Sequence, residues 1–303
     1  MSIPACTLTF LAARPDMPFI RETLPHLVRM LRFPFSERLL LIDTAPLPPR
    51  YDGIPGIGTL EEMLALGRDF IRTGVIDRII EVRHTDPSQL AIYRSQHTRP
   101  VRHTRDHRGY PNLACALELA LPQTDYLLHF DSDMLLHCAP GFDWVSHAIQ
   151  LLEEHPDIIA VAPRPGPPTP DGSLTRQPAG HVLDPAAFYR FKHFSTRRFL
   201  IDRRRFRRLL PIEPRSASRR LWLESLFRFR SPLEAWEVLI SRALEKSMFF
   251  RADTGGGEAW TLHTPDHGAE FLWALPRIIT RIERGDFPPA QAGDYDLQLR
   301  LWT

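Results

Sequence analysis

Residues 125–136, DYLLHFDSDMLL, decide the fold. An apolar run over residues 126–130 leads into Asp131, Ser132 and Asp133, and a second apolar run follows directly. A short apolar run bounded by polar residues predicts a buried strand. Two carboxylates placed directly after a strand can turn toward one cation, and oxygen ligands of this kind suit Mg²⁺ and Mn²⁺. An Asp-x-Asp pair also arises by chance, so its meaning depends on the surrounding sequence.

Upstream of this stretch, predicted strands and helices alternate. The apolar patterns predict strands over residues 6–12, 39–42 and 79–82, and helices over 19–31, 60–73 and 112–121. Gly74 is expected to stop the second helix, and Pro25 is expected to kink or split the first. The polar residues 83–109 are expected to form a long loop. Strands separated by helices predict an α/β fold with a mostly parallel sheet flanked by helices.

Polar or small residues follow several of these strands directly. Ala13 and Arg14 follow the first strand, Asp43 follows the second, and Asp131 and Asp133 follow the strand at 126–130. Ligands bind at the carboxyl ends of the strands in parallel sheets. We therefore expect these residues to lie along one edge.

The second half of the chain is less regular. We expect a strand at residues 158–161, a helix at 232–248 and a helix at 270–283 interrupted at Pro276. Residues 196–210 are strongly basic, with aromatic and aliphatic residues interleaved. The simplest explanation of that stretch is a solvated helix face.

Composition narrows the class of protein. With 303 residues, 43% hydrophobic and 24% charged, the chain is typical of a soluble globular protein, and its net charge of +2 is too small to favour nucleic-acid binding. Only Lys192 and Lys246 are lysines among 38 basic residues, which reflects codon bias or a need to bind phosphate or carboxylate. The three cysteines indicate no disulfide or zinc framework, so we expect a reducing cytoplasm. We see neither a signal peptide nor an apolar run long enough to span a membrane.

Five segments of the first half together resemble the family 2-like glycosyltransferases of the GT-A fold. They are CTLTFLAARPD (6–16), PFIRETLPHLVRML (18–31), RLLLIDT (38–44), IIEVRH (79–84) and NLACALELALPQTDYLLHFDSDMLL (112–136). The resemblance covers roughly residues 5–140. It implies one continuous GT-A domain, with a nucleotide-sugar-binding half at 1–140 and an acceptor-binding half with C-terminal helices at 141–303.

The resemblance also implies a set of donor-site residues. It implies an enzyme that moves a sugar from a nucleotide-sugar donor, with a UDP-sugar favoured, and that needs Mn²⁺ or Mg²⁺. Asp133 and Asp131 would hold the metal, and Asp131 with Ser132 would also face the donor. The nucleotide base of the donor would contact Ala13, Arg14 and Asp43. Asn112 falls near an Arg-Asn pair of the family, although Pro111 stands in place of the arginine.

A catalytic base and a further metal ligand are expected from the second half. Inverting transfer needs a carboxylate that takes the proton of the acceptor hydroxyl. The family's acidic pair is absent from the helix at 232–248, so Glu237 is the first candidate and Glu234 the second. Three positions apart, the two are expected to share a helix face. Related enzymes often add a histidine from a late loop to the metal, and His263 fits that place better than His267.

The acceptor is not specified by any motif. The basic residues 196–210 could receive an acidic or phosphorylated acceptor, help to hold the donor diphosphate, or contact anionic lipid at the inner membrane face. The alternation of Phe and Arg is compatible with single-stranded nucleic acid, but the near-neutral net charge disfavours it.

Three alternative functions share parts of this pattern. A phosphohydrolase of the haloacid dehalogenase type also uses Asp-x-Asp after a strand, but near the N-terminus and followed by threonine. A nucleotidyltransferase usually has a glycine-rich loop where residues 12–15 read AARP. A non-catalytic nucleotide-sugar binder on the same fold remains an alternative, because the sequence defines the catalytic base poorly.

Overall fold

A mixed β-sheet forms the centre of the molecule. The computed structural model describes residues 4–47, 51, 54, 56–175, 182–184, 188–228 and 231–303. Across the sheet its described strands are β3 (Arg78–Val82), β2 (Glu37–Asp43), β1 (Cys6–Ala12), β4 (Tyr126–Asp131), β10 (Arg198–Asp202), β6 (Ile158–Ala162), β11 (Phe250–Thr254), β9 (Phe188–Phe191) and β8 (Val182–Asp184). β3, β2, β1 and β4 are mutually parallel, and β6 pairs with β11 in parallel. β10 runs antiparallel to both of its neighbours, β4 and β6. The predicted mostly parallel sheet is confirmed.

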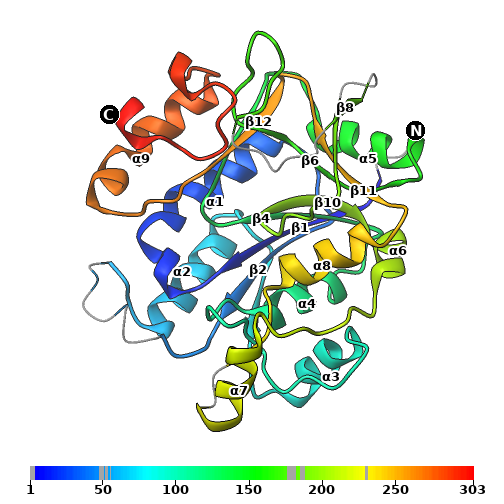
Figure 1. The fold of residues 1–303 in the computed structure, drawn as a ribbon. Helices are drawn as coiled ribbons and strands as arrows, with labels where there is room; N and C mark the ends of the chain where they lie inside the picture. The colour runs from blue at the N-terminus through cyan, green and yellow to red at the C-terminus, as the bar shows by residue number, and fades with distance from the viewer. Residues whose placement is uncertain are drawn as a thin grey trace.

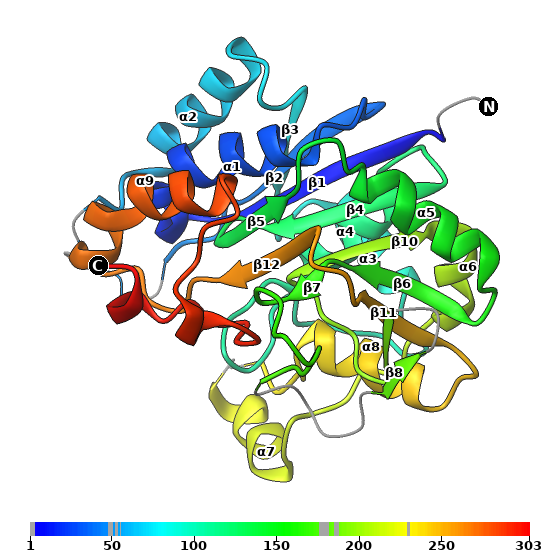
Figure 2. The same cartoon turned by 90° about the horizontal axis from the view of Figure 1, so that it is seen from above.

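A smaller sheet branches from the central one. It consists of β5 (Met134–Cys138), β12 (Ala259–His263) and β7 (Arg164–Pro165), with β12 in the middle. β4 ends at Asp131 and β5 begins at Met134, so Ser132 and Asp133 form the turn between the two sheets. Seen from above, β5 and β12 lie beside the end of β4 (Figure 2). The Asp-Ser-Asp stretch therefore lies where both sheets meet.

Helices cover both faces of the central sheet (Figure 1). One face carries α1 (Met17–Leu31), α2 (Leu60–Arg72) and α5 (Trp144–Glu154), and the other carries α3 (Pro87–Ser95), α4 (Asn112–Ala120), α6 (Arg203–Phe206) and α8 (Trp236–Glu245). α9 (Ala269–Glu283) packs on the small sheet, and α7 (Arg219–Arg228) lies at the periphery in both ribbon views (Figures 1 and 2). No helix in these described ranges is long and apolar enough to cross a membrane.

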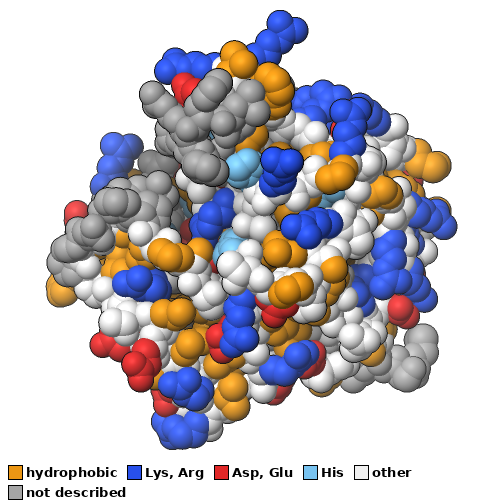
Figure 3. Space-filling model, turned by 90° about the horizontal axis from the view of Figure 1, so that it is seen from below, with side chains coloured by type: hydrophobic (Ala, Val, Ile, Leu, Met, Phe, Trp, Pro, Cys, Tyr) orange, Lys and Arg blue, Asp and Glu red, His pale blue; other side chains and the backbone are white. Residues whose placement is uncertain are grey.

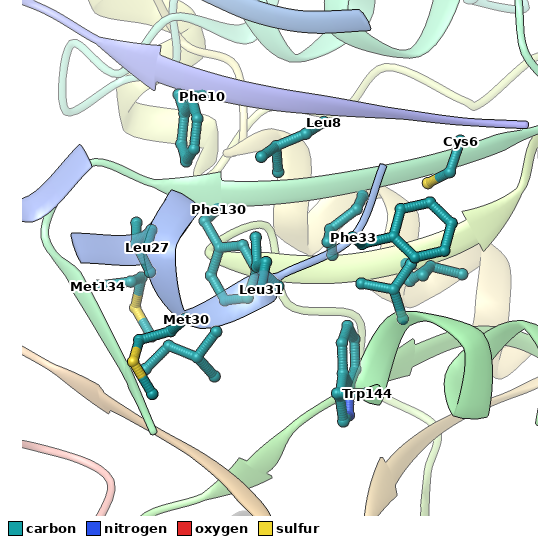
Figure 4. Close-up of a cluster of buried hydrophobic side chains, with 14 of the residues drawn as sticks. Cys6, Leu8, Phe10, Leu27, Met30, Leu31, Phe33, Phe130, Met134 and Trp144 are labelled. Carbon is teal, nitrogen blue, oxygen red and sulfur yellow. The ribbon is translucent and has the colours of Figure 1, made fainter. Parts of the chain in front are cut away.

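The core beneath α1 joins the start of the chain to both sheets. Figure 4 shows Leu27, Met30 and Leu31 of α1 gathered around Phe130 of β4 and Met134 of β5. These side chains are buried and belong to one apolar cluster, which also includes Trp144 of α5. Burying such side chains stabilises the fold by roughly 1.5–3 kcal/mol each. The turn that carries Asp133 is therefore anchored on both sides by buried strands.

Several local expectations were wrong. Residues 83–109 are not one loop, because α3 forms within them. Asp86 caps this helix by accepting from the backbone N–H groups of Ser88 and Gln89, and Pro87 occupies the first helical position. α1 is not split at Pro25 and α9 is not interrupted at Pro276, since each continues as one helix. Burial of apolar side chains on both sides of each proline holds the helix together. Gly74 ends α2 as predicted, with a φ of 73°.

The two halves of the chain share both sheets. β4 of the first half pairs with β10 of the second, and β5 pairs with β12. A boundary near residue 140 therefore separates two stretches of sequence whose strands lie side by side.

Candidate active site

The carboxyl ends of the parallel strands meet at one edge of the central sheet. In the pairing of β1 with β4, Leu11 lies opposite Asp131, and Asp43 lies opposite Val82 in the pairing of β2 with β3. Ala13 and Arg14 follow β1 directly. The structure thus brings Ala13, Arg14, Asp43 and Asp131 to the same edge, as parallel strands require.

Asp133 and His263 come together because β5 and β12 are antiparallel neighbours. His263 lies opposite Met134 in that pairing, and its Nε2 is 3.5 Å from Oδ2 of Asp133. The other ring nitrogen, Nδ1, bonds Oδ1 of Asp296 at 2.8 Å. Oδ1 of Asp133 is buried and has no hydrogen-bond partner among the described residues. Asp296 therefore fixes the imidazole so that Nε2 faces the Asp133 carboxylate.

These residues fit a divalent cation. A carboxylate oxygen without a partner beside an oriented imidazole is the donor set of Mn²⁺ and related ions, and a carboxylate behind the histidine is a frequent companion of such ligands. Burial would raise the pKa of Asp133, but His263 and Arg197 hold it below its usual value, so the carboxylate stays ionised. Within the described ranges, no three His, Cys, Asp or Glu side chains form a complete cage. The remaining ligands would have to come from substrate phosphates and water.

Asp131 and Ser132 lie against a third carboxylate, Asp16. Asp16 ends the short helix after β1, and its Oδ2 accepts the backbone N–H of Ala13 at 2.8 Å. Burial raises the pKa of Asp16 to about 7, and the charges of Asp133 and Asp131 act in the same direction, while Ser132 opposes them. Sequence analysis missed Asp16, although it follows the same strand as Arg14.

Glu237 lies in the first turn of α8 and faces the start of β10. Its Oε2 accepts the backbone N–H of Thr196 at 3.0 Å, and Nε2 of His193 lies 3.8 Å from its Oε1. Burial would lower the pKa of the Arg197 guanidinium, but the charges of Tyr295, Asp133 and Asp131 raise it, and Glu237 contributes too. Arg197 is thus within electrostatic range of both the Asp131–Asp133 turn and Glu237.

Glu234 does not share a helix face with Glu237, contrary to the sequence-based expectation. α8 begins at Trp236 and not at residue 232, so Glu234 precedes the helix. It is buried, and its Oε1 accepts from Arg242 at 2.6 Å. The side-chain amide of Asn112 holds this segment, since it donates to the Glu234 carbonyl and accepts from the Trp236 backbone N–H. Both polar atoms of Asn112 are therefore engaged by the backbone.

The residues expected at the nucleotide base are partly engaged by protein groups. Asp43 is 4% exposed and contacts Arg105, and its Oδ1 lies 2.9 Å from Nε2 of His84. Burial would raise the pKa of Asp43, but His84 and Arg105 hold it low. Arg14 donates to the carbonyl of Gly58 at 2.7 Å. His84 and Arg105 were missed because they come from the segment expected to be one long loop, in which no single residue stood out.

The basic stretch 196–210 is only in part the solvated helix face that was expected. Arg198–Asp202 form β10, in the middle of the sheet, and Arg203–Leu209 form the short α6 and a 3-10 turn, on which Arg204, Arg207 and Arg208 are exposed. Arg198 pairs with the buried Asp253, and Arg203 donates to the carbonyls of Leu119 and Thr124. On the face seen from below, Lys and Arg side chains stand in separate groups among neutral and hydrophobic ones (Figure 3).

No protein-family model and no curated protein matches this chain. Among solved structures, it is similar to GalNAc-T7, solved with UDP, GalNAc and Mn²⁺, at 11% identity over 86% of this chain and 44% of that chain, with a TM-score of 0.51. A mannosyltransferase from Pyrobaculum calidifontis, solved with GDP-Man and Mn²⁺, matches at 13% identity over 91% and 61%, with a TM-score of 0.46. The galactosyltransferase LgtC matches at 12% identity over 91% and 94%, with a TM-score of 0.44.

The likeness to GalNAc-T7 is one of fold. The central, mostly parallel sheet flanked by helices is that of the GT-A fold. The chain spans less than two thirds of the length of the first two of these structures.

Proposed function

We propose that the chain is a metal-dependent glycosyltransferase of the family 2-like type, which moves a sugar from a nucleotide-sugar donor to an acceptor hydroxyl with inversion. A UDP-sugar is the favoured donor. The observation that carries the proposal is the turn after β4, where Asp133, with its unpartnered Oδ1, faces a histidine oriented by Asp296. This turn lies at the sheet edge where α/β folds bind ligands. We further propose a cytoplasmic enzyme, and contact with the inner membrane face is a second proposal.

In this proposal each group of the site has a distinct task. Asp133, His263 and Asp131 would hold Mn²⁺ or Mg²⁺, which when bound neutralises charge on the leaving diphosphate. Asp131 and Ser132 would contact the donor. The nucleotide base of the donor would lie at Ala13, Arg14 and Asp43. Asn112 would support the segment before α8. Arg197 would offer a guanidinium to the diphosphate.

Glu237 is the proposed base. Its carboxylate would take the proton of the acceptor hydroxyl as that oxygen attacks the sugar carbon and the diphosphate leaves from the opposite side. The N–H of Thr196 orients the carboxylate, and Arg197 is within electrostatic range of both Glu237 and the Asp131–Asp133 turn. Glu234, the second candidate, is already paired with Arg242. The acceptor is a hydroxyl compound, for which an acidic or phosphorylated class stays a proposal.

A thermal-shift screen of nucleoside diphosphates with and without Mn²⁺ tests donor binding, because ligands that bind only the folded state raise Tm. We expect Mn²⁺-dependent stabilisation in the wild type and none in Asp133→Ala. Glu237→Gln should bind like the wild type but transfer sugar about 10²–10⁴ times more slowly, as expected for loss of a general base.

Asp286→Ala is the matched control, since Asp286 is an exposed carboxylate paired with Arg281 on α9. It should behave as the wild type in both assays. The proposal fails if wild-type protein binds no nucleoside diphosphate and turns over no nucleotide sugar. Binding without transfer to any acceptor would identify a non-catalytic relative.

A further inference from the structure

A buried chain of polar side chains lies directly behind Asp131. Thr9 of β1, Glu118 of α4 and His129 of β4 are each at most 3% exposed. The hydroxyl of Thr9 donates to Glu118, the Glu118 carboxylate contacts Nδ1 of His129, and Nε2 of His129 lies 3.2 Å from Oδ1 of Asp131. The chain runs from the sheet interior to the first aspartate of the site.

The surroundings of this chain are apolar. His129 stacks on Phe199 with ring centroids 5.0 Å apart. Burying an imidazole and a carboxylate costs several kcal/mol per ion, and well-packed apolar residues of similar volume often stabilise a core as well or better. Stability therefore gives no reason for charged groups at Glu118 and His129.

The buried polar side chains act on the Asp131 carboxylate by fixing its orientation. His129 and Asp131 are two residues apart on one strand, so their side chains point to the same face. Carboxylates lie against both ring nitrogens of His129, which favours the doubly protonated imidazolium: Nδ1–H donates to Glu118 and Nε2–H donates to Oδ1 of Asp131. The backbone N–H of Asp131 donates to the Arg197 carbonyl at 2.8 Å. Oδ2 of Asp131 has no hydrogen bond within the part of the chain that the structure describes, and it is the oxygen left for a ligand.

We propose that His129 is a positioning residue, which Glu118 and Thr9 hold in place so that it fixes the Asp131 carboxylate and presents Oδ2 to the nucleotide-sugar. This inference rests on the proposed function, because the orientation of Asp131 matters only if a donor binds there. It assigns the cluster a role in donor binding and not in bond making.

Two substitutions separate positioning from packing. In His129→Gln the amide nitrogen can take the place of Nε2 and still donate to Asp131. In His129→Asn the shorter side chain reaches Glu118 but not Asp131. We expect His129→Asn to weaken binding of UDP with Mn²⁺ by about 10–100-fold, the usual effect of removing a partner behind a ligand residue, and His129→Gln to restore most of it. Isothermal titration calorimetry measures both.

Asp131→Ala supplies the second readout. If His129 acts through Asp131, then His129→Gln and His129→Asn bind equally well when Asp131 is already alanine, because the coupling is lost. His97→Asn is the matched control, since His97 is also a buried imidazole, and its Nδ1 lies 2.9 Å from the Tyr93 carbonyl of α3. It should lower Tm and leave the Kd for UDP unchanged.

The outcomes are distinct. Equal binding by His129→Gln and His129→Asn, or a difference that persists in Asp131→Ala, overturns the positioning role and leaves the proposed function intact. Absence of any nucleoside-diphosphate binding by the folded wild type overturns both.

Discussion

One carboxylate oxygen, Oδ1 of Asp296, decides which nitrogen of His263 faces Asp133. It bonds Nδ1 at 2.8 Å, so Nε2 is the nitrogen turned toward the aspartate. The contact depends on the backbone, since the segment around Asp296 bridges to the end of β12. Asp296 thus orients His263, which lies 33 positions earlier in the chain.

We expect Asp296→Ala to weaken Mn²⁺ binding about 10–100-fold in the presence of a nucleoside diphosphate, because the imidazole loses its orienting partner. Asp296→Asn should have a smaller effect, since the amide oxygen can still accept from Nδ1–H. The Mn²⁺ concentration that gives half of the Tm shift measures this. An unchanged midpoint in Asp296→Ala would refute the assignment.

The sequence predicted the residues that follow strands but not those that support them. The positions of Asp131 and Asp133 could be predicted because each follows an apolar run, whereas His263 was suggested by resemblance. His129 and Asp296 could not, because their roles depend on which elements pack beside them. A polar residue inside an apolar strand looks the same in sequence whether or not it contacts a site.

Among the elements, β10 was the hardest to predict. Its apolar centre, Phe199 to Ile201, is flanked by arginines, and counting their charges as exposed gave a solvated helix face. In the fold, Arg198 reaches Asp253 and Arg203 reaches backbone carbonyls. An arginine side chain can be buried when the N–H groups of its guanidinium all find hydrogen-bond acceptors. The charge of a residue is therefore a poor guide to its exposure.

α1 and α9 are held together by one carboxylate. Glu283 of α9 lies 2.9 Å from Nδ1 of His26 and 2.8 Å from Arg29, both on α1. The hydrogen bonds from these two residues lower the pKa of Glu283 to about 2. The contact joins the helix on the small sheet to the helix on the central sheet.

Glu283→Gln should therefore destabilise the protein at neutral pH, by about 1–2 kcal/mol, because the fully buried His26 loses a charged partner. A carboxyl whose pKa is lowered by folding stabilises above its unfolded value, 4.5, and loses that effect as pH falls toward 2. The difference in Tm between wild type and variant should shrink over that range. Glu270→Gln, on the exposed start of α9, should show no such difference; a gap that stays constant down to pH 2 would contradict the account.

At the scale of the whole molecule, the α/β class and the parallel order of the first strands could be predicted from alternating strands and helices. The small sheet could not. β5 and β12 are antiparallel partners from opposite halves of the chain, and nothing local in either strand specifies the other. The sequence therefore predicted the edge on which Asp131 lies, and resemblance alone suggested the histidine beside it.

The pairing of these distant strands has a kinetic consequence. Thr9 bonds a carbonyl 119 residues away, and Thr264 bonds one 131 residues away, at Asp133. Contacts of such long range form slowly, and chains of this size commonly fold through intermediates with native-like helices. On dilution from denaturant, far-UV circular dichroism should recover before Mn²⁺-dependent nucleotide binding. Simultaneous recovery of the two signals would mean that the two halves condense in one step. Until the second half docks, newly made chains would expose the unpaired sides of β4 and β5, and this interval is when aggregation competes with folding.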